Sequence, residues 1–279
     1  MLKSYLALRF QNFIPNKDVS LVVGVVFVVA AVLLAYRLFR NRDWWGSCLP
    51  IGALCYALGF FFRVVTIEKH QDSRGWLILG QIFIACSPAA FLAFNYIVHG
   101  RLVVNSLGAR HSRIRPTRVA FVFVSSDIAT FLVQAAGSGL MITKSTVAGK
   151  NIFLIGLVLQ TLSYLVFCAL FVSAVLSAKE EGIATGTGVW WEVVQLLGFP
   201  SVPIMVRCIF RCVEDGLGRS SVLSIDEVYF YCLDSLPLLL ATSIYVVGWP
   251  GDYIDSGLGS VAEYPPASIE MNTSATVAA

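Results

Sequence analysis

Long runs of apolar residues, separated by short polar segments, recur along the whole chain. Each run is roughly 20 residues long, which is the length that an α-helix needs to cross about 30 Å of hydrocarbon. The pattern predicts seven spanning helices, over Val19–Phe39, Cys48–Ile67, Trp76–Val98, Val119–Ile142, Ile152–Leu176, Val189–Phe210 and Val228–Trp249. The expected fold class is an all-α integral membrane protein, a bundle of seven transmembrane helices.

One transmembrane domain over residues 1–252 is expected, because the chain shows no internal repeat and no second domain. Residues 253–279 are rich in Ser, Thr, Ala and Pro and contain no Lys or Arg, which predicts a disordered C-terminal tail. The connections are short, so neighbouring helices are expected to run antiparallel. Prolines inside the apolar runs predict kinks, at Pro88, Pro200, Pro203 and Pro237.

The composition supports a lipid environment. Hydrophobic residues make up 57% of the chain, charged residues make up 13%, and the mean hydropathy is +0.76. A soluble domain carries roughly a quarter charged residues, and a water-soluble fold of this size cannot bury so much apolar surface. The net charge of +3 and the lack of a basic stretch interleaved with aromatic residues argue against a nucleic-acid partner.

Several chemistries lack their sequence signatures. The seven cysteines are odd in number and lie mostly within apolar runs, so they predict packing residues and no disulfide framework or metal site. No lysine lies within a predicted span, where a retinal Schiff base would need one. The three histidines lie at or beyond predicted helix ends without ligand spacing, and no G-x-S-x-G motif is present. The sequence therefore predicts a protein that is not an enzyme and holds no cofactor or metal.

The orientation depends on the loop between the third and fourth spans. Lys and Arg residues outside the spans divide equally between the two faces, nine on each. Five arginines concentrate in that one loop, and they favour its face as cytoplasmic: Arg101, Arg110, Arg113, Arg115 and Arg118. The N-terminus is then outside, the tail is cytoplasmic, and the sequon at Asn272 is not used.

Charged and amide side chains inside a span indicate a structural or functional role, because a charge at a helix centre costs about 2.5–3.5 kcal/mol of insertion free energy. Helical spacing groups them by face. Asp127 and Gln134 share a face of the fourth helix, and Gln160 shares a face of the fifth with Tyr164. Two stripes with spacing i, i+4, i+7 run along the sixth and seventh helices, at Arg207, Arg211 and Glu214 and at Glu227, Tyr231 and Asp234.

These groups, together with Arg63 near the end of the second helix, have two interpretations. In the first, they pair only with one another and hold the bundle together, each contact stabilising it by about 1 kcal/mol or less. Alternatively, they line a cavity that accepts a polar headgroup or an amine. The segment Ala135–Gly139 is rich in small residues and predicts close helix packing.

Ordered motifs over the second to seventh spans resemble those of a known family. The second helix carries Gly59 and Arg63 of an E-x-x-G-Y-x-x-R element, with Tyr56 and Phe60 in place of the acid and the tyrosine. The next three helices carry Gln81, Pro88, Tyr96 and Arg101, then Ser126-Asp127 and Gln134 to Gly137, then Gly149, Gly156 and Gln160. The last part carries Arg207, Arg211, Glu214, Gly218, Glu227, Tyr231, Asp234 and Pro250-Gly251, with Trp249 where a histidine is usual.

In these motifs the chain resembles the fungal RTA-like family, also called the lipid-translocating exporter family and named for resistance to an aminocholesterol. The resemblance implies a seven-span plasma-membrane protein with its N-terminus outside. It also implies export or flipping of sphingoid long-chain bases, sterol-like compounds or other cationic amphiphiles, with resistance to toxic lipids. The expected partners are membrane lipids and an amphiphilic small molecule.

On this resemblance, the hypothesis for a substrate-binding site comprises Arg63, Asp127, Gln134, Gln160, Arg207, Arg211, Glu214, Glu227, Tyr231 and Asp234. Its four acids offer partners to a cationic amphiphile or to the three arginines. The alternative function is a receptor-like seven-helix protein that senses lipids and regulates other transporters. The oligomeric state has no signal in the sequence.

Overall fold

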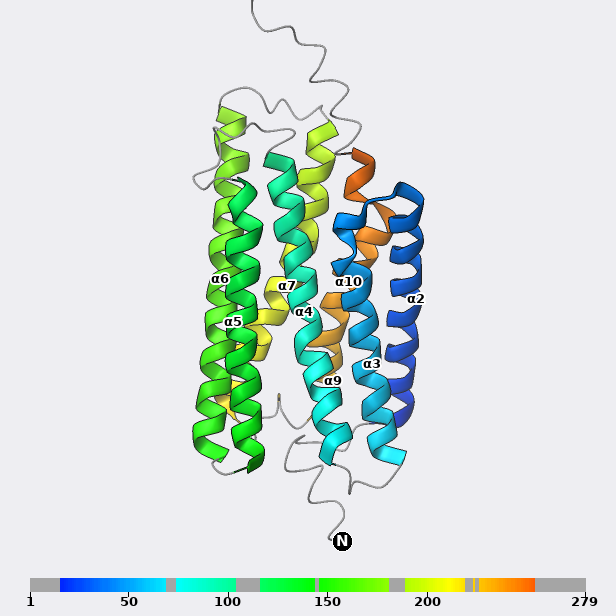
Figure 1. Ribbon diagram of the computed structural model, residues 1–279, viewed down its shortest axis with the longest axis vertical. Coiled ribbons are helices and arrows are strands. Elements are labelled where there is room, and N and C mark those ends of the chain that lie inside the picture. Colours follow the sequence, from blue (N-terminus) through cyan, green and yellow to red (C-terminus); the bar gives the residue numbers. More distant parts are fainter. Residues whose placement is uncertain are drawn as a thin grey trace, which may run out of the picture.

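The computed structural model describes residues 16–68, 74–103, 116–143, 146–180, 189–218, 223 and 226–253. Six long helices come first, as Figure 1 shows: α2 (Lys17–Asn41), α3 (Cys48–Glu68), α4 (Arg74–Leu102), α5 (Pro116–Thr143), α6 (Thr146–Glu180) and α7 (Val189–Leu217). The last span is built from α9 (Glu227–Phe230), the π-helical segment η4 (Tyr231–Ser235) and α10 (Leu236–Val247). A short 3-10 turn, η1 (Trp44–Gly46), connects α2 to α3.

The seven-span prediction is confirmed. Within the described ranges, seven helical stretches are long and apolar enough to cross a membrane. Several helices continue beyond the predicted ends; α6 has 35 residues, or about 50 Å, and α7 ends at Leu217 instead of Phe210. Hydropathy marks the apolar stretch, whereas the backbone stays helical into the polar residues that follow it. Arg211 and Glu214 are therefore helical residues.

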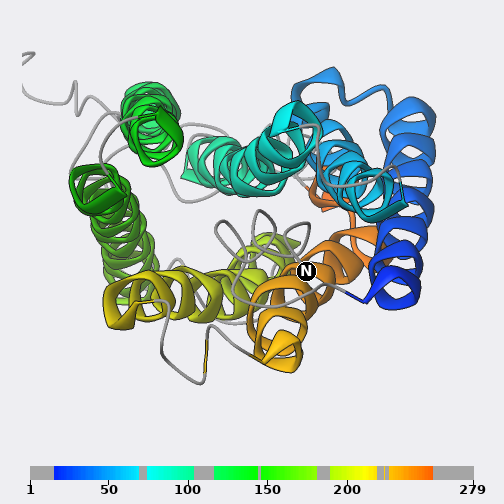
Figure 2. The same ribbon diagram turned by 90° about the horizontal axis from the view of Figure 1, so that it is seen from below.

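The helices follow one another around a ring when the bundle is seen end-on, as in Figure 2. Each long helix packs against its neighbours in the sequence, and α10 packs against both α7 and α2, which closes the ring. Neighbouring helices run antiparallel, as the short connections predicted (Figure 1). The helix α4 also contacts α7 across the ring.

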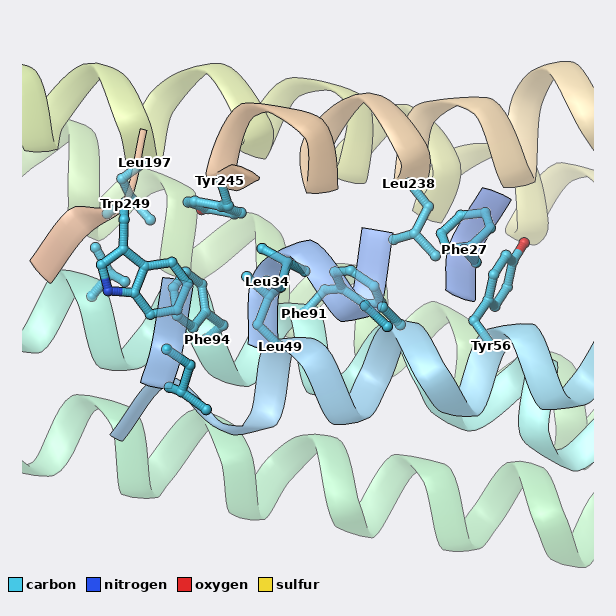
Figure 3. Packing of buried hydrophobic residues seen from close by; sticks show 14 of the residues in the cluster. Phe27, Leu34, Leu49, Tyr56, Phe91, Phe94, Leu197, Leu238, Tyr245 and Trp249 are labelled. Carbon is cyan, nitrogen blue, oxygen red and sulfur yellow. The ribbon is translucent and has the colours of Figure 1, made fainter. Parts of the chain in front are cut away.

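Two groups of aromatic and aliphatic side chains form the core. Figure 3 shows the larger group between α2, α3, α4 and α10, with Tyr56 near one end and Trp249 near the other. The smaller group joins α4, α5, α6 and α7 through Tyr96, Phe123 and Phe167, whose rings contact one another edge-on or tilted. Packing in both groups determines which face each helix turns toward its neighbour. The polar residues on the same helices are oriented as a result.

Apolar side chains cover the outside of the bundle as well. Large hydrophobic residues are exposed on α2, α5 and α6, among them Val32, Phe121, Leu132 and Leu165. In water such a surface would be a large aggregation-prone patch. In a bilayer it contacts acyl chains, so the exposed surface agrees with the membrane-spanning fold.

The first and last spans are tied together at both ends. At one end the backbone N–H of Asn16 donates to the Glu227 carboxylate at 2.9 Å, and the hydroxyls of Ser20 and Tyr231 lie 3.0 Å apart. At the other end Asn41 Nδ2 donates to Asp252, which also lies 3.6 Å from Arg37. The start of α2 meets the start of the last span, and the end of α2 meets its end, so the two helices run parallel.

The last span departs from a regular α-helix at its proline. Pro237 has no N–H to donate to the preceding turn, and the π-helical segment that contains Asp234 and Ser235 comes directly before α10. The kink predicted at Pro237 stays a prediction, and the π-helical segment is the irregularity that precedes this proline. The other three predicted kink prolines lie inside the continuous helices α4 and α7. The predicted tail from 254 onward, Arg110, Arg113, Arg115 and Asn272 lie outside the described residues.

Candidate functional site

Asp234 is the centre of a charged cluster in the interior of the bundle, formed by Arg207, Arg211, Glu214 and Asp234. Its side chain is completely buried, with 0% exposed. Arg207 places Nε 3.1 Å from Oδ1 of Asp234 and donates from Nη2 to Oδ2 at 3.3 Å. Arg211 Nε lies 3.7 Å from Oδ1. Because one carboxylate faces two arginines, a second acid is needed to balance the charge.

Glu214 supplies that second acid. Its Oε2 accepts a 3.0 Å hydrogen bond from Arg211 Nη1, one helical turn away on α7. These four residues are two arginines and two acids, and Asp215, the next residue on α7, is a third acid near Arg211 and Glu214. Buried charges are tolerated in the bilayer when they pair in this way.

Tyr56 of α3 completes the surroundings of Asp234. Its hydroxyl donates to Asp234 Oδ2 at 2.8 Å and lies 3.0 Å from the hydroxyl of Ser235. The π-helical segment presents Asp234 and Ser235 together, so one phenol reaches both. The cluster joins three spans: α3, α7 and the last one.

A second charged group lies where α3, α2 and the start of the last span meet. Arg63 Nη2 is 3.8 Å from Glu227 Oε1, and the Arg63 guanidinium lies over the Phe230 ring at 5.0 Å from its centroid. The hydroxyl of Tyr231 donates to the same Glu227 oxygen at 2.8 Å. Glu227 thus pairs with α3 and α2, and not with α7.

A small cavity of about 30 Å³ lies beside the charged cluster, between α4, α5, α6, α7 and α10. It has room for roughly one or two water molecules. Gln134 of α5 donates to Gln160 of α6 at 2.9 Å, and this amide pair lines the cavity together with Arg207 and Arg211. The cavity therefore brings four of the ten predicted site residues together in one space, which apolar side chains of α4, α6 and α10 also line.

Asp127 lies apart from these groups, on α5. Its Oδ2 accepts a 2.9 Å hydrogen bond from the hydroxyl of Tyr96 on α4, and its side chain is 2% exposed. Asp127 and Gln134 share a face, as their spacing predicted, yet the first contacts α4 and the second contacts α6. The two residues belong to different polar contacts.

Spacing within helices predicted some of these contacts and missed others. Among the described residues, the stripes on the sixth and seventh spans meet through Asp234 with Arg207 and Arg211. The tyrosines Tyr56 and Tyr96 were not among the predicted site residues, although both positions belong to the family motifs. Tyr56 is the position where the family motif has an acid, which is the signal that could have pointed to it.

Among the described residues, no group of three or more His, Cys, Asp or Glu side chains is placed to hold a metal ion. The interior instead offers charge pairs, an amide pair and a small cavity that both the arginines and the amides line, all enclosed by helices with apolar outer faces. These features define a multi-pass integral membrane protein with a polar interior.

The chain belongs to the RTA1-like family, whose model, described as "RTA1 like protein", matches residues 49–256. This match confirms the resemblance found in the motifs. It covers α3 to the last span, and so includes the charged cluster and the amide pair.

Curated relatives come from Saccharomyces cerevisiae. Protein RTM1 is 28% identical, with 76% of this chain and 70% of the relative aligned. The sphingoid long-chain base transporter RSB1 is 23% identical, with 95% of this chain and 79% of the relative aligned. Protoporphyrin uptake protein 1 is 27% identical, over 71% of this chain and 66% of the relative. No solved structure matches this chain.

Proposed function

We propose that this protein translocates amphiphilic lipids across the membrane and thereby confers resistance to toxic ones. The cargo in this proposal is a sphingoid long-chain base or a similar cationic or sterol-like amphiphile. One of its relatives is named as a sphingoid long-chain base transporter, and another as a protoporphyrin uptake protein. The proposed location is the plasma membrane, with the N-terminus outside and the C-terminus in the cytoplasm.

The observation that carries the proposal is the fully buried Asp234 between Arg207 and Arg211, two arginines that also line a small cavity. Charges inside a bilayer are costly, and in membrane proteins they commonly mark a substrate or ion pathway. The ten predicted site residues remain the proposed substrate-binding set. In this proposal the headgroup of the amphiphile replaces some of their mutual contacts.

A cavity of about 30 Å³ is too small for a headgroup, so the described conformation is a closed one. Translocation requires helices to separate around the cavity. The helices α5 and α6 approach each other closely at Gly137 and at Gly156. We expect this pair to move as a unit relative to α4 and α7.

Reconstitution of the purified full-length chain tests the proposal. Vesicles with the wild-type protein should move a labelled long-chain base across the bilayer faster than protein-free vesicles. Asp234→Asn, reconstituted at the same amount of protein per vesicle as the wild type, should lose this activity. Asp18→Asn, the same change at an exposed position in the first turn of α2, is the matched control.

The competing function is a lipid-sensing regulator of other transporters. It predicts that cells with the wild-type protein are resistant, whereas vesicles that contain only this protein show no transport. That result would contradict the translocator proposal. Wild-type activity of Asp234→Asn in vesicles would instead remove Asp234 from the binding set.

A further inference from the structure

Asp127 differs from the other acids of the proposed binding set in having no arginine beside it. Asp234, Glu214 and Glu227 each lie within 4 Å of an arginine nitrogen. Within the described part of the chain, no Lys, Arg or His forms an ion pair with Asp127. Its Oδ2 accepts from Tyr96, while its Oδ1 has no hydrogen-bond partner among the described residues.

The groups around Asp127 leave that oxygen without a donor. Tyr96 faces Asp127 from α4. The packed group that contains Tyr96 also contains Tyr164 of α6, and Cys168 of α6 and Cys208 of α7 pack against this group. None of these side chains carries a positive charge. His99, one turn along α4 from Tyr96, packs its ring against Phe167 and Phe171. The nearest arginine on α7, Arg207, directs its guanidinium to Asp234.

An ionised carboxylate buried without a cation is far more costly than the neutral acid. In the closed conformation the Asp127 side chain is 2% exposed, and an ammonium group, with three N–H donors to satisfy, needs more room than such a site offers. The cation that fits against Oδ1 in this conformation is a proton. Once the helices separate, the same oxygen becomes accessible to a larger cation.

We propose that Asp127 holds either a proton or the ammonium group of the amphiphile, never both, so that the protein exchanges one for the other. This inference rests on the proposed function and adds the energy source to it. When the ammonium group binds, the proton leaves to water on the side to which the site is open. When the ammonium group leaves on the other side, a proton replaces it and the site closes.

Proton release on binding tests the exchange directly. The probe is N,N,N-trimethylsphingosine, whose permanent charge means that it releases no proton itself. Added to the purified full-length protein in a weakly buffered detergent solution, it should bind and release about one proton per molecule bound. Where Asp127 is protonated in the free protein, the affinity for the probe should fall about tenfold for each unit by which the pH is lowered.

Two variants assign the effect to this carboxylate. Asp127→Asn should stay folded and inserted but lose both binding and proton release, and Asp127→Glu should restore both. Asp18→Asn is again the matched control and should behave as the wild type. Binding of the probe to D127N with wild-type affinity, or proton release from D127N, would overturn the assignment.

The same vesicles separate this inference from the proposed function. If wild-type protein moves the probe and an imposed pH gradient drives its accumulation, the exchange is supported. If it moves the probe at a rate that no pH gradient changes, the exchange is wrong and translocation stands. If it moves neither the probe nor the labelled long-chain base, the proposed function itself fails.

Discussion

The hydroxyl of Tyr56 on α3 donates a 2.8 Å hydrogen bond to Oδ2 of Asp234, the oxygen that Arg207 also approaches at 3.3 Å. In the family motif an acid takes the place of this tyrosine. A second carboxylate here would face Asp234 and add a further negative charge directly beside it. Tyr56 supplies a neutral donor instead, so Asp234 keeps the two arginines as its charged neighbours.

Tyr56→Phe removes this donor without changing the packing of the ring. Hydrogen bonds to charged groups contribute about 1.5–3 kcal/mol, so we expect a loss of stability of that size. Thermal unfolding in detergent measures it. Tyr36→Phe, the same change on the exposed face of α2, is the control and should leave the unfolding temperature unchanged. Equal effects of the two variants would contradict the role of the hydrogen bond.

Arg207→Ala leaves Asp234 buried with a weaker set of partners, and breaking a buried ion pair costs about 3–5 kcal/mol. The double variant with Asp234→Asn should be less destabilised than the sum of the two single variants, because the uncompensated charge is then gone. Unfolding of all three variants measures the coupling. By contrast, Arg37→Ala breaks a partly exposed pair with Asp252, whose side chains are 30% and 42% exposed, and should cost about 1 kcal/mol or less. Strict additivity would mean that the buried pair does not interact.

Gly137 and Gly139 lie two residues apart near the end of α5 but face different surroundings. A Cβ at Gly137 would lie 2.5 Å from the backbone nitrogen of Phe153 and 2.8 Å from the carbonyl oxygen of Gly149, whereas a Cβ at Gly139 would meet no atom within 4 Å. Gly137→Ala should therefore force α5 and α6 apart and destabilise the protein by about 1–3 kcal/mol. Gly139→Ala should be neutral or slightly stabilising in a helix. The expression level and unfolding temperature of the two variants compare them directly, and a harmless G137A would refute the close approach.

Variants of the amide pair Gln134 and Gln160 distinguish a structural role of the pair from a role in binding the headgroup. Gln134→Leu leaves Gln160 without its 2.9 Å partner and should cost about 1–3 kcal/mol. The double change of Gln134 and Gln160 to Leu removes both polar groups and should recover much of that stability. If the pair also contacts the headgroup, the stable double variant will still lose transport in vesicles. Full transport by the double variant would assign the pair to structure alone.

The sequence was sufficient for the fold but not for the helix ends. Apolar runs near the thickness of a bilayer predict where a chain enters lipid, so seven spans in antiparallel order were predictable. They do not show how far a helix continues beyond the lipid, and α7 accordingly extends to Leu217. The π-helical segment around Asp234 was also beyond reach, because Pro237 predicts a disturbance without its form.

For the site, spacing defines the face of a helix but not the neighbour that this face meets. Asp127 and Gln134 share a face, yet Tyr96 of α4 binds one and Gln160 of α6 binds the other. The rotation and separation of whole helices decide these contacts. Core packing in turn determines that rotation and separation. Tyr56 was missed for a related reason: its place beside Asp234 joins residues 178 positions apart.

The ties between α2 and the last span affect how the protein is made. Asn16 and Ser20 meet Glu227 and Tyr231, and Asn41 meets Asp252, so α2 finds these polar partners only when the last span arrives. Until then the ring stays open, and Arg207 and Arg211 lack Asp234 as a counterion. A nascent chain stalled before the seventh helix should therefore be a ready substrate for membrane quality control.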